Sequence, residues 1–191
     1  MRWRNAFVAA VGLLTVSSGV SGCSIVPGAP DLTVTQAVRK IDSSLNGVFG
    51  AIHPRVKWRE GPGGMDVHDN SFTNKPNGVV SVHRERYLRT KVSGRKLDKI
   101  TEVVRDYLKK SGFELEEKFI RPHFVSAKSP DGLEVGFLVE GSGGISIGAS
   151  VDAKSPGHGG DIEGEEGDKF PTAPDGGPDH APDLYDPYWS K

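Results

Sequence analysis

Cys23 is the only cysteine among the 191 residues of the chain. A single cysteine cannot form an intrachain disulfide, so it indicates a modified residue, an intermolecular disulfide or a reactive thiol. The segment before it has a basic start, with Arg2 and Arg4, and continues as an apolar run from Ala6 to Val20. This pattern is typical of a secretory signal peptide, and the run is shorter than the roughly 20 apolar residues that span a bilayer. We therefore expect the chain to be exported and cut next to Cys23.

Val20, Ser21 and Gly22 place an aliphatic residue and two small residues directly before the thiol. Together with Cys23 they resemble the lipobox of bacterial lipoproteins, whose small residues admit the lipoprotein signal peptidase and whose cysteine carries a diacylglyceryl group. The resemblance implies that residues 1–22 are removed and that acyl chains such as palmitate hold Cys23 in the outer face of the cell membrane. Each buried CH₂ contributes about 0.8 kcal/mol, so two or three chains anchor durably. The alternative is an ordinary secreted protein with an unmodified Cys23, but no A-x-A-like cleavage site lies nearby.

Arg84 and Arg86 are the second pair of residues whose spacing indicates a site. They alternate within a β-like run from Val79 to Arg89, which places both guanidinium groups on one face of a strand. Such a pair is a candidate anion-binding site for an anionic envelope polymer or for phospholipid head groups, and a solvated strand face is the alternative. Residues 31–151 carry 19 Lys and Arg against 15 Asp and Glu, which is too weak a balance to predict nucleic-acid binding.

The remaining reactive side chains form no recognisable catalytic or metal-binding pattern. Asp66 and His68 share a face of a short predicted strand and Asp69 follows, but zinc or calcium needs three or more convergent ligands. The one G-x-S-x-G string, Gly144 to Gly148, lies in a run of alternating apolar residues that predicts a strand, and not at the strand-to-helix turn that a nucleophilic serine needs. No glycine-rich loop has P-loop spacing, and acylation would occupy the thiol of Cys23. We therefore expect no cofactor, no metal and no enzymatic activity. A binding module of the cell envelope is the favoured interpretation, and a small ligand carrier or enzyme is the alternative.

Two amphipathic helices are predicted to support these residues. Thr33 and Gln36 form a capping box, after which apolar residues recur at helical spacing as far as Ile52. Ser93 is a candidate N-cap for a second helix, and Gly112 occupies the position expected just beyond its end.

Alternating apolar residues and turn signals predict the strands. We expect Gly61–Gly64 to break one early strand, residues 79–89 to form a longer strand, and the Ser129–Gly132 turn to open a meander that ends near Val151. The predicted fold is α+β, in the order α-β-β-α-β-β-β, with an antiparallel sheet packed on one side by two helices.

The predicted boundaries are a signal peptide (1–22), a tether (23–31), the folded domain (32–151) and a tail (152–191). The tail is rich in Gly and Pro and carries 10 acidic against 3 basic residues, so we expect it to be disordered. The aromatic end from Leu184 to Trp189 either docks on the domain or a partner or is solvated, and solvation is favoured.

The stretch from Val82 to Val151 resembles uncharacterised small lipoproteins of actinobacteria. The shared features are an arginine-rich strand, a helix that ends in Tyr107-Leu-Lys-Lys-Ser-Gly-Phe113, and the Ser129-Pro-Asp-Gly132 turn. The resemblance implies lipoprotein status and an α+β fold, and that family has no assigned activity. Many members carry a C-terminal cysteine paired with another in the domain, and this chain has neither.

Overall fold

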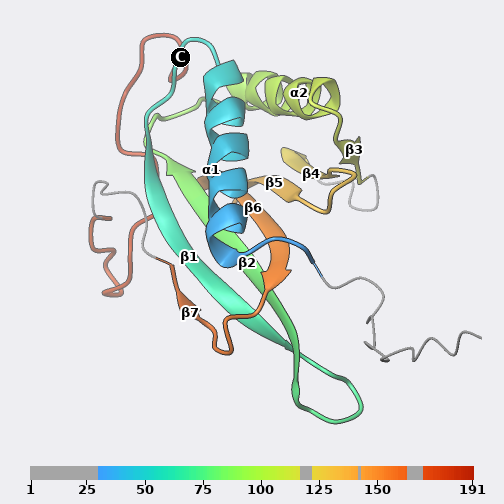
Figure 1. Cartoon of the computed structure of the whole chain (residues 1–191). Helices are drawn as coiled ribbons and strands as arrows, with labels where there is room; N and C mark the ends of the chain where they lie inside the picture. The colour runs from blue at the N-terminus through green and yellow to red at the C-terminus, as the bar shows by residue number, and fades with distance from the viewer. Residues whose placement is uncertain (1–29, 117–121, 142, 163–169) are drawn as a thin grey trace, which may run out of the picture.

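The structure, a computed structural model, describes residues 30–116, 122–141, 143–162 and 170–191 (Figure 1). Within these ranges the chain forms two helices and one seven-stranded sheet, with strands in the order β3-β4-β5-β6-β2-β1-β7 and every pairing antiparallel. Both helices pack on one side of the sheet, as the sequence predicts. The elements are α1 (Val34–Ala51), β1 (Trp58–Asp69), β2 (Pro76–Leu88), α2 (Gly94–Lys110), β3 (Glu114–Leu115), β4 (Phe124–Lys128), β5 (Glu134–Val139), β6 (Ile145–Lys154) and β7 (Gly160–Asp161).

Helix α1 begins and ends where the sequence predicts. The Thr33 side chain accepts a hydrogen bond from the Gln36 backbone, and the Gln36 side chain accepts one from the Thr33 backbone, which completes the capping box. The apolar stripe of the helix is buried against β2 and β6, across which α1 runs in Figure 1. Its buried residues are Ala37, Ile41, Leu45, Val48 and Phe49.

Helix α2 follows the prediction at both ends, with one difference. Ser93 is the N-cap residue, but its side chain makes no capping bond and instead donates to the carbonyl of Lys191. Gly112 has a φ of +84°, the left-handed conformation that glycine adopts at low cost just beyond a helix. The helix therefore begins next to the C-terminal end of the chain.

Strand β1 corrects the expectation that Gly61–Gly64 break it. The strand runs from Trp58 through these glycines to Asp69 and tolerates them by a shift of register between Glu60 and Gly63. Pro62 falls within this irregular stretch, where the ladder does not require its missing N–H. A side chain at Gly61 would begin 2.7 Å from the Tyr87 ring, so the glycine makes room for that ring.

The β4–β5–β6 meander confirms the predicted turns and strand alternation. Gly132, with a φ of +83°, donates from its backbone to Ser129 in the predicted tight turn. β6 continues beyond Val151 to Lys154, and β7 follows at Gly160–Asp161. The folded part therefore extends past the predicted boundary at residue 151, because Ala153 still contributes a fully buried side chain to the core.

Candidate functional site

The predicted lipidation site Cys23 and the lipobox-like residues Val20, Ser21 and Gly22 lie outside the described residues, as do the predicted signal peptide and most of the predicted tether. The structure does show where the chain joins the domain. The carbonyl of Leu32 accepts a hydrogen bond from the backbone of Lys154, at the end of β6. Residues 23–31 therefore connect to the domain at the end where α1 begins (Figure 1).

Arg84 and Arg86 do share one face of β2, but that face lies under helix α1. Their exposed fractions are 5% and 0%, so both the solvated strand face and the candidate anion site are wrong. The same alternation that brings the two arginines together also brings them to the side of Val80, Val82 and Leu88, which is the core side. Period-two spacing alone did not show which face of the strand the helices would cover.

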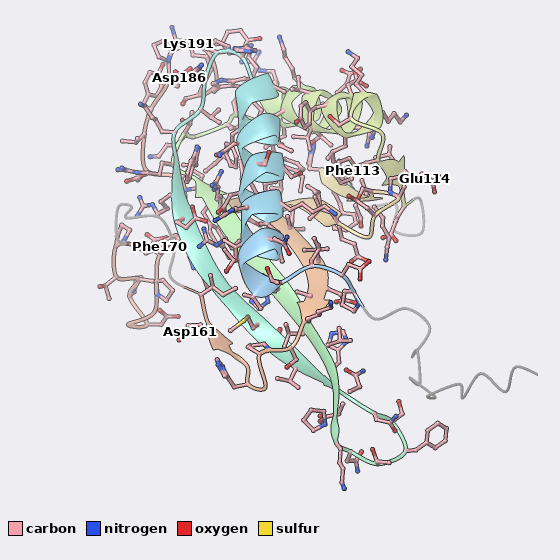
Figure 2. All side chains as sticks on the ribbon, viewed as in Figure 1. Phe113, Glu114, Asp161, Phe170, Asp186 and Lys191 are labelled. Atoms are coloured by element: carbon pink, nitrogen blue, oxygen red, sulfur yellow. The ribbon has the colours of Figure 1, made fainter. Side chains whose placement is uncertain are left out.

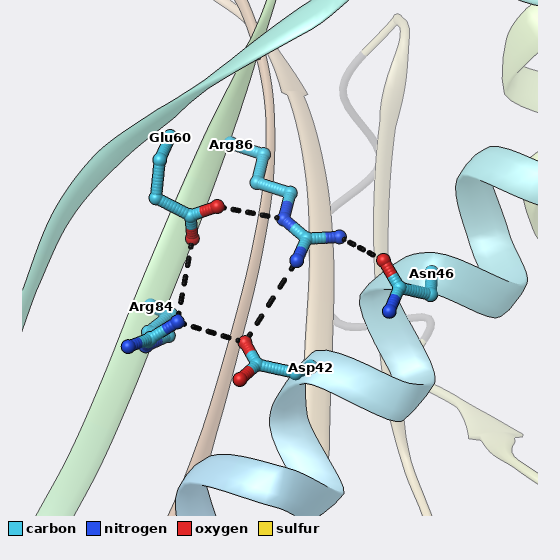
Figure 3. Close-up of polar contacts among 5 residues, drawn as sticks. All are labelled: Asp42, Asn46, Glu60, Arg84 and Arg86. Atoms are coloured by element: carbon cyan, nitrogen blue, oxygen red, sulfur yellow. Dashed lines mark hydrogen bonds and ion pairs between the residues drawn. The ribbon is translucent and has the colours of Figure 1, made fainter. Parts of the chain in front are cut away.

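The two guanidinium groups are neutralised by carboxylates from α1 and β1 (Figure 3). Arg86 donates from Nε to Glu60 Oε2 at 3.1 Å and from Nη1 to Asn46 Oδ1 at 2.7 Å. Arg84 donates from Nη1 to Asp42 Oδ1 at 3.0 Å. Two positive and two negative groups therefore form one buried cluster that joins α1, β1 and β2.

Burial dominates the electrostatics of this cluster. Desolvation raises the pKa of Glu60, against the opposing effect of Arg86 and Arg84, which favour its charged form. The Arg86 guanidinium also lies 4.1 Å from the centre of the Trp58 ring, a cation–π contact. The arginines are paired inside their own chain and cannot receive an external anion, so the cluster has a structural role, which is to connect α1, β1 and β2.

The sequence of α1 contains a signal for this buried polar cluster. Asp42 and Asn46 are four residues apart and flank the apolar stripe formed by Ile41 and Leu45, so both point from the same side of the helix towards the sheet. Polar residues at this spacing beside a core-facing stripe indicate buried polar partners.

The C-terminal segment contradicts the predicted solvated end. Trp189 has an exposed fraction of 0%, and its indole N–H donates to the carbonyl of Pro54 at 2.7 Å. In Figure 2, Asp186 and Lys191 lie beside the C-terminal end of α1, whereas Phe170 lies beside β1. The expectation of disorder is therefore wrong for residues 170–191, while residues 163–169 lie outside the described ranges.

An ion pair and backbone hydrogen bonds hold this segment. The carboxylate of Asp183 accepts from Arg59 at 2.9 Å and from Arg89 at 2.8 Å. Leu184 donates its N–H to the carbonyl of Arg89, and its own carbonyl accepts from Lys91, so the segment pairs as a short parallel bridge beside β2. Low apolar content predicted disorder, but the buried Trp189, the paired carboxylate of Asp183 and the backbone hydrogen bonds of Leu184 hold the segment on the domain.

The same segment covers part of the sheet face that the helices leave open. The Tyr87 side chain, on the opposite face of β2 from Arg86, lies 5.4 Å from the Phe170 ring and 4.2 Å from the His180 ring. The guanidinium of Arg59 lies 5.2 Å from the Phe170 ring centre. The covered part of the open face is therefore the part over β1 and the end of β2.

The rest of the open face contains a shallow groove of about 470 Å³ over β2, β4, β5 and β6. Its floor is nearly bare because Gly136 of β5 lies directly opposite Gly148 of β6. Phe124 and Leu138 line one side, and Glu85 of β2 lines the other. The remaining lining residues are Pro62, His83, Ser126, Glu134, Ser146 and Ser150, together with Arg84, Val135 and Ala149, whose side chains are buried in the domain.

Asp66 and His68 do not converge on one point. Asp66 Oδ2 lies 3.4 Å from Nδ1 of His83, whereas Nε2 of His68 lies 3.8 Å from Oδ1 of Asp152. Within the described ranges, no group of three or more His, Cys, Asp or Glu side chains is arranged to hold a metal ion.

Two further findings bear on the class of protein. None of the helices in the described part of the chain is both long enough and apolar enough to cross a membrane. Comparisons with protein-family models, with curated proteins and with solved structures found no match to the chain.

Proposed function

We propose that the chain is a lipid-anchored bacterial surface protein whose domain is a non-enzymatic binding module of the cell envelope. Acyl chains on Cys23 would hold it on the extracytoplasmic face of the cell membrane, and residues 24–31 would connect the anchor to the domain. The proposal of an anchor rests on the sequence pattern around Cys23. The proposal of a binding module rests on the open face of the sheet.

The glycine-floored groove is the observation that carries the binding function. Glycine within a strand destabilises a protein by about 0.5–1 kcal/mol relative to alanine, and it often marks a place where another molecule approaches the backbone. Gly136 and Gly148 form a directly opposed pair on central strands, and a Cβ at Gly136 would meet only the carbonyl of Val125, at 3.9 Å. No packing requirement therefore explains the missing side chain at Gly136, and access for a partner does.

The side chains around the groove favour a protein over an anionic polymer as the partner. Glu85 places a negative charge at the groove, which disfavours teichoic-acid-like polymers or phospholipid head groups there, whereas the Glu134 carboxylate is paired with Lys128 at 2.6 Å. Phe124 and Leu138 offer apolar surface in the same groove as Glu85. A protein surface with apolar and basic side chains complements this combination, as in ordinary polar-rimmed interfaces.

A matched pair of substitutions tests the binding surface. Gly136→Arg would fill the groove, whereas Gly50→Arg adds the same side chain to an open site on α1, where a Cβ meets nothing within 4 Å. After crosslinking in cells and purification of each variant, we expect a reproducible envelope protein to be recovered with the wild type and with Gly50→Arg but lost with Gly136→Arg. Equal recovery with both variants would remove the groove as the binding surface.

The anchor is tested separately. Metabolic labelling with an alkyne fatty acid should mark the wild type and a Ser24→Ala control, and Cys23→Ala should abolish the label. Labelling that persists in Cys23→Ala would contradict the proposed attachment site.

A further inference from the structure

The hairpin of β1 and β2 extends beyond the rest of the sheet and ends in an exposed aromatic side chain. Residues 69–78 are all exposed, and Phe72 has an exposed fraction of 97%, the largest among the bulky apolar side chains of the described residues. β2 continues three residues past its last pair with β6, Val79 with Lys154, which is about 10 Å at 3.3 Å per residue. The connecting loop lies beyond that point (Figure 1).

The loop has a defined structure that turns Phe72 away from the domain. Asn70 Oδ1 accepts hydrogen bonds from the backbone of Phe72 at 3.0 Å and of Thr73 at 3.2 Å. The backbone of Asn70 donates to Lys75 and accepts from Asn74, which closes the loop. A closed turn around an Asn side chain is a common way to fix a short loop, so the exposure of Phe72 follows from the local geometry.

The hairpin end and the start of the domain lie at the same end of the molecule. The backbone of Lys154 donates a hydrogen bond to the carbonyl of Leu32, and the adjacent Ser155 donates one to the carbonyl of Gly78. Gly78 lies in β2 just before the residues that pair with β6. The end of the chain marked C lies at the opposite end in Figure 1. Residues 23–31 therefore connect to the domain beside the base of the hairpin.

We propose that the loop at residues 70–75 is a second membrane contact, in which Phe72 inserts into the interface of the bilayer that holds Cys23. This inference rests on the proposed lipid anchor. Nine residues of chain, 23–31, span at most about 30 Å, so an acylated Cys23 keeps the base of the hairpin within that distance of the membrane. The hairpin projects at least about 10 Å from its base, and its end can therefore reach the lipid while the anchor is in place.

The composition of the loop suits a lipid interface. Aromatic side chains concentrate at the boundary between head groups and acyl chains, where an apolar ring can be buried while its polar neighbours stay hydrated. Around Phe72 the loop carries Asn70, Ser71, Thr73 and Asn74, whose polar groups suit the head-group layer, and Lys75, whose charge favours anionic lipids. The alternative occupant of this surface is another protein.

The test places a fluorescent probe beside Phe72 and leaves Phe72 in place. Ser71→Cys, labelled with a thiol-reactive nitrobenzoxadiazole, is made in the full chain and reconstituted into phosphatidylglycerol and phosphatidylethanolamine vesicles with and without a doxyl-labelled lipid. We expect blue-shifted emission and strong quenching by the doxyl lipid. Adding Phe72→Ser should reduce the quenching severalfold, because the loop then lacks its apolar side chain.

Tyr185 provides the matched control, since it is the other strongly exposed large aromatic side chain among the residues that the structure describes, and it lies in the C-terminal segment. Adding Tyr185→Ser to Ser71→Cys should leave the quenching unchanged. Equal quenching with Phe72 present and absent would overturn the membrane contact. Shielding of the probe that requires added envelope proteins and does not occur with vesicles alone would also overturn it, in favour of a protein contact.

The label also separates this inference from the proposed anchor. If Cys23 is acylated, the thiol at position 71 is the only free one and the chain takes one label. A chain that takes two labels has an unmodified Cys23, which contradicts the anchor. The comparison of Phe72→Ser with Tyr185→Ser still tests the membrane contact, because the label on Cys23 is common to both variants.

Discussion

Replacing Trp189 by alanine should destabilise the whole domain, although it is the third residue from the end of the sequence. Its side chain is fully buried, and a buried Trp→Ala substitution costs about 3–5 kcal/mol. Loss of the indole hydrogen bond leaves the carbonyl of Pro54 without that donor and adds about 1 kcal/mol. The expected total, roughly 4–6 kcal/mol, is a large fraction of the 5–15 kcal/mol that typically separates folded from unfolded states.

Urea unfolding of the purified chain, followed by circular dichroism, measures this effect. Trp189→Phe retains most of the buried area but removes the N–H donor, so its cost should be well below that of Trp189→Ala. Tyr185→Ala, at a side chain with an exposed fraction of 63%, should change the free energy of unfolding by less than about 0.5 kcal/mol. A cost below about 1 kcal/mol for Trp189→Ala would refute the docked position of the C-terminal segment and restore the solvated end that the sequence favours.

Three further predictions concern other parts of the domain. Hydrogen bonds from Arg89 and then from Arg59 lower the pKa of Asp183 from 3.8 to about 2. The stability that Asp183 contributes should therefore be fully present above about pH 4 and lost as the pH falls towards 2. The difference in urea midpoint between the wild type and Asp183→Asn should close over that window. A difference that stays constant with pH would count against the ion pair. Arg86→Met should cost about 3–5 kcal/mol of unfolding free energy, because it leaves the Glu60 carboxylate buried without its main positive partner. Adding Glu60→Met should recover part of that loss in a double-mutant cycle. Additive costs would show that the two groups are not coupled. Gly136→Thr should raise the free energy of unfolding, measured in thermal melts, by about 0.5–1 kcal/mol, because the site is open and threonine favours strands. A destabilised variant would mean that other side chains already pack against the groove floor.

Most of the fold follows from short-range signals in the sequence. The capping box at Thr33 and the glycine at position 112 fix helix ends through bonds and backbone angles that involve only neighbouring residues. The Ser129–Gly132 turn is likewise local. The continuity of β1 through Gly61–Gly64 was not predictable in this way, because pairing with β2 and the space needed by the Tyr87 ring decide it.

The candidate sites were less predictable because they depend on which face of each strand is covered. Alternation correctly grouped Arg84 with Arg86, yet only the position of α1, through Asp42 and Asn46, makes their face the inner one. Phe72 carries the opposite signal, an aromatic residue inside a polar loop, which the sequence shows directly. The docking of Trp189 depends on a contact 135 residues away in the chain, which no local pattern indicates.

The arrangement of charge suggests why the two faces of the sheet can have separate roles. On the helix side, Arg84 and Arg86 are committed to Asp42, Asn46 and Glu60, and such buried groups are costly to separate. That face therefore cannot open to a partner without losing much of the stability of the domain. The other face has its floor made by backbone at Gly136 and Gly148, and a partner can reach it without breaking any of these contacts. Binding on the open face should accordingly leave the buried cluster intact, so the coupling free energy between Arg86 and Glu60 should be the same with and without the partner.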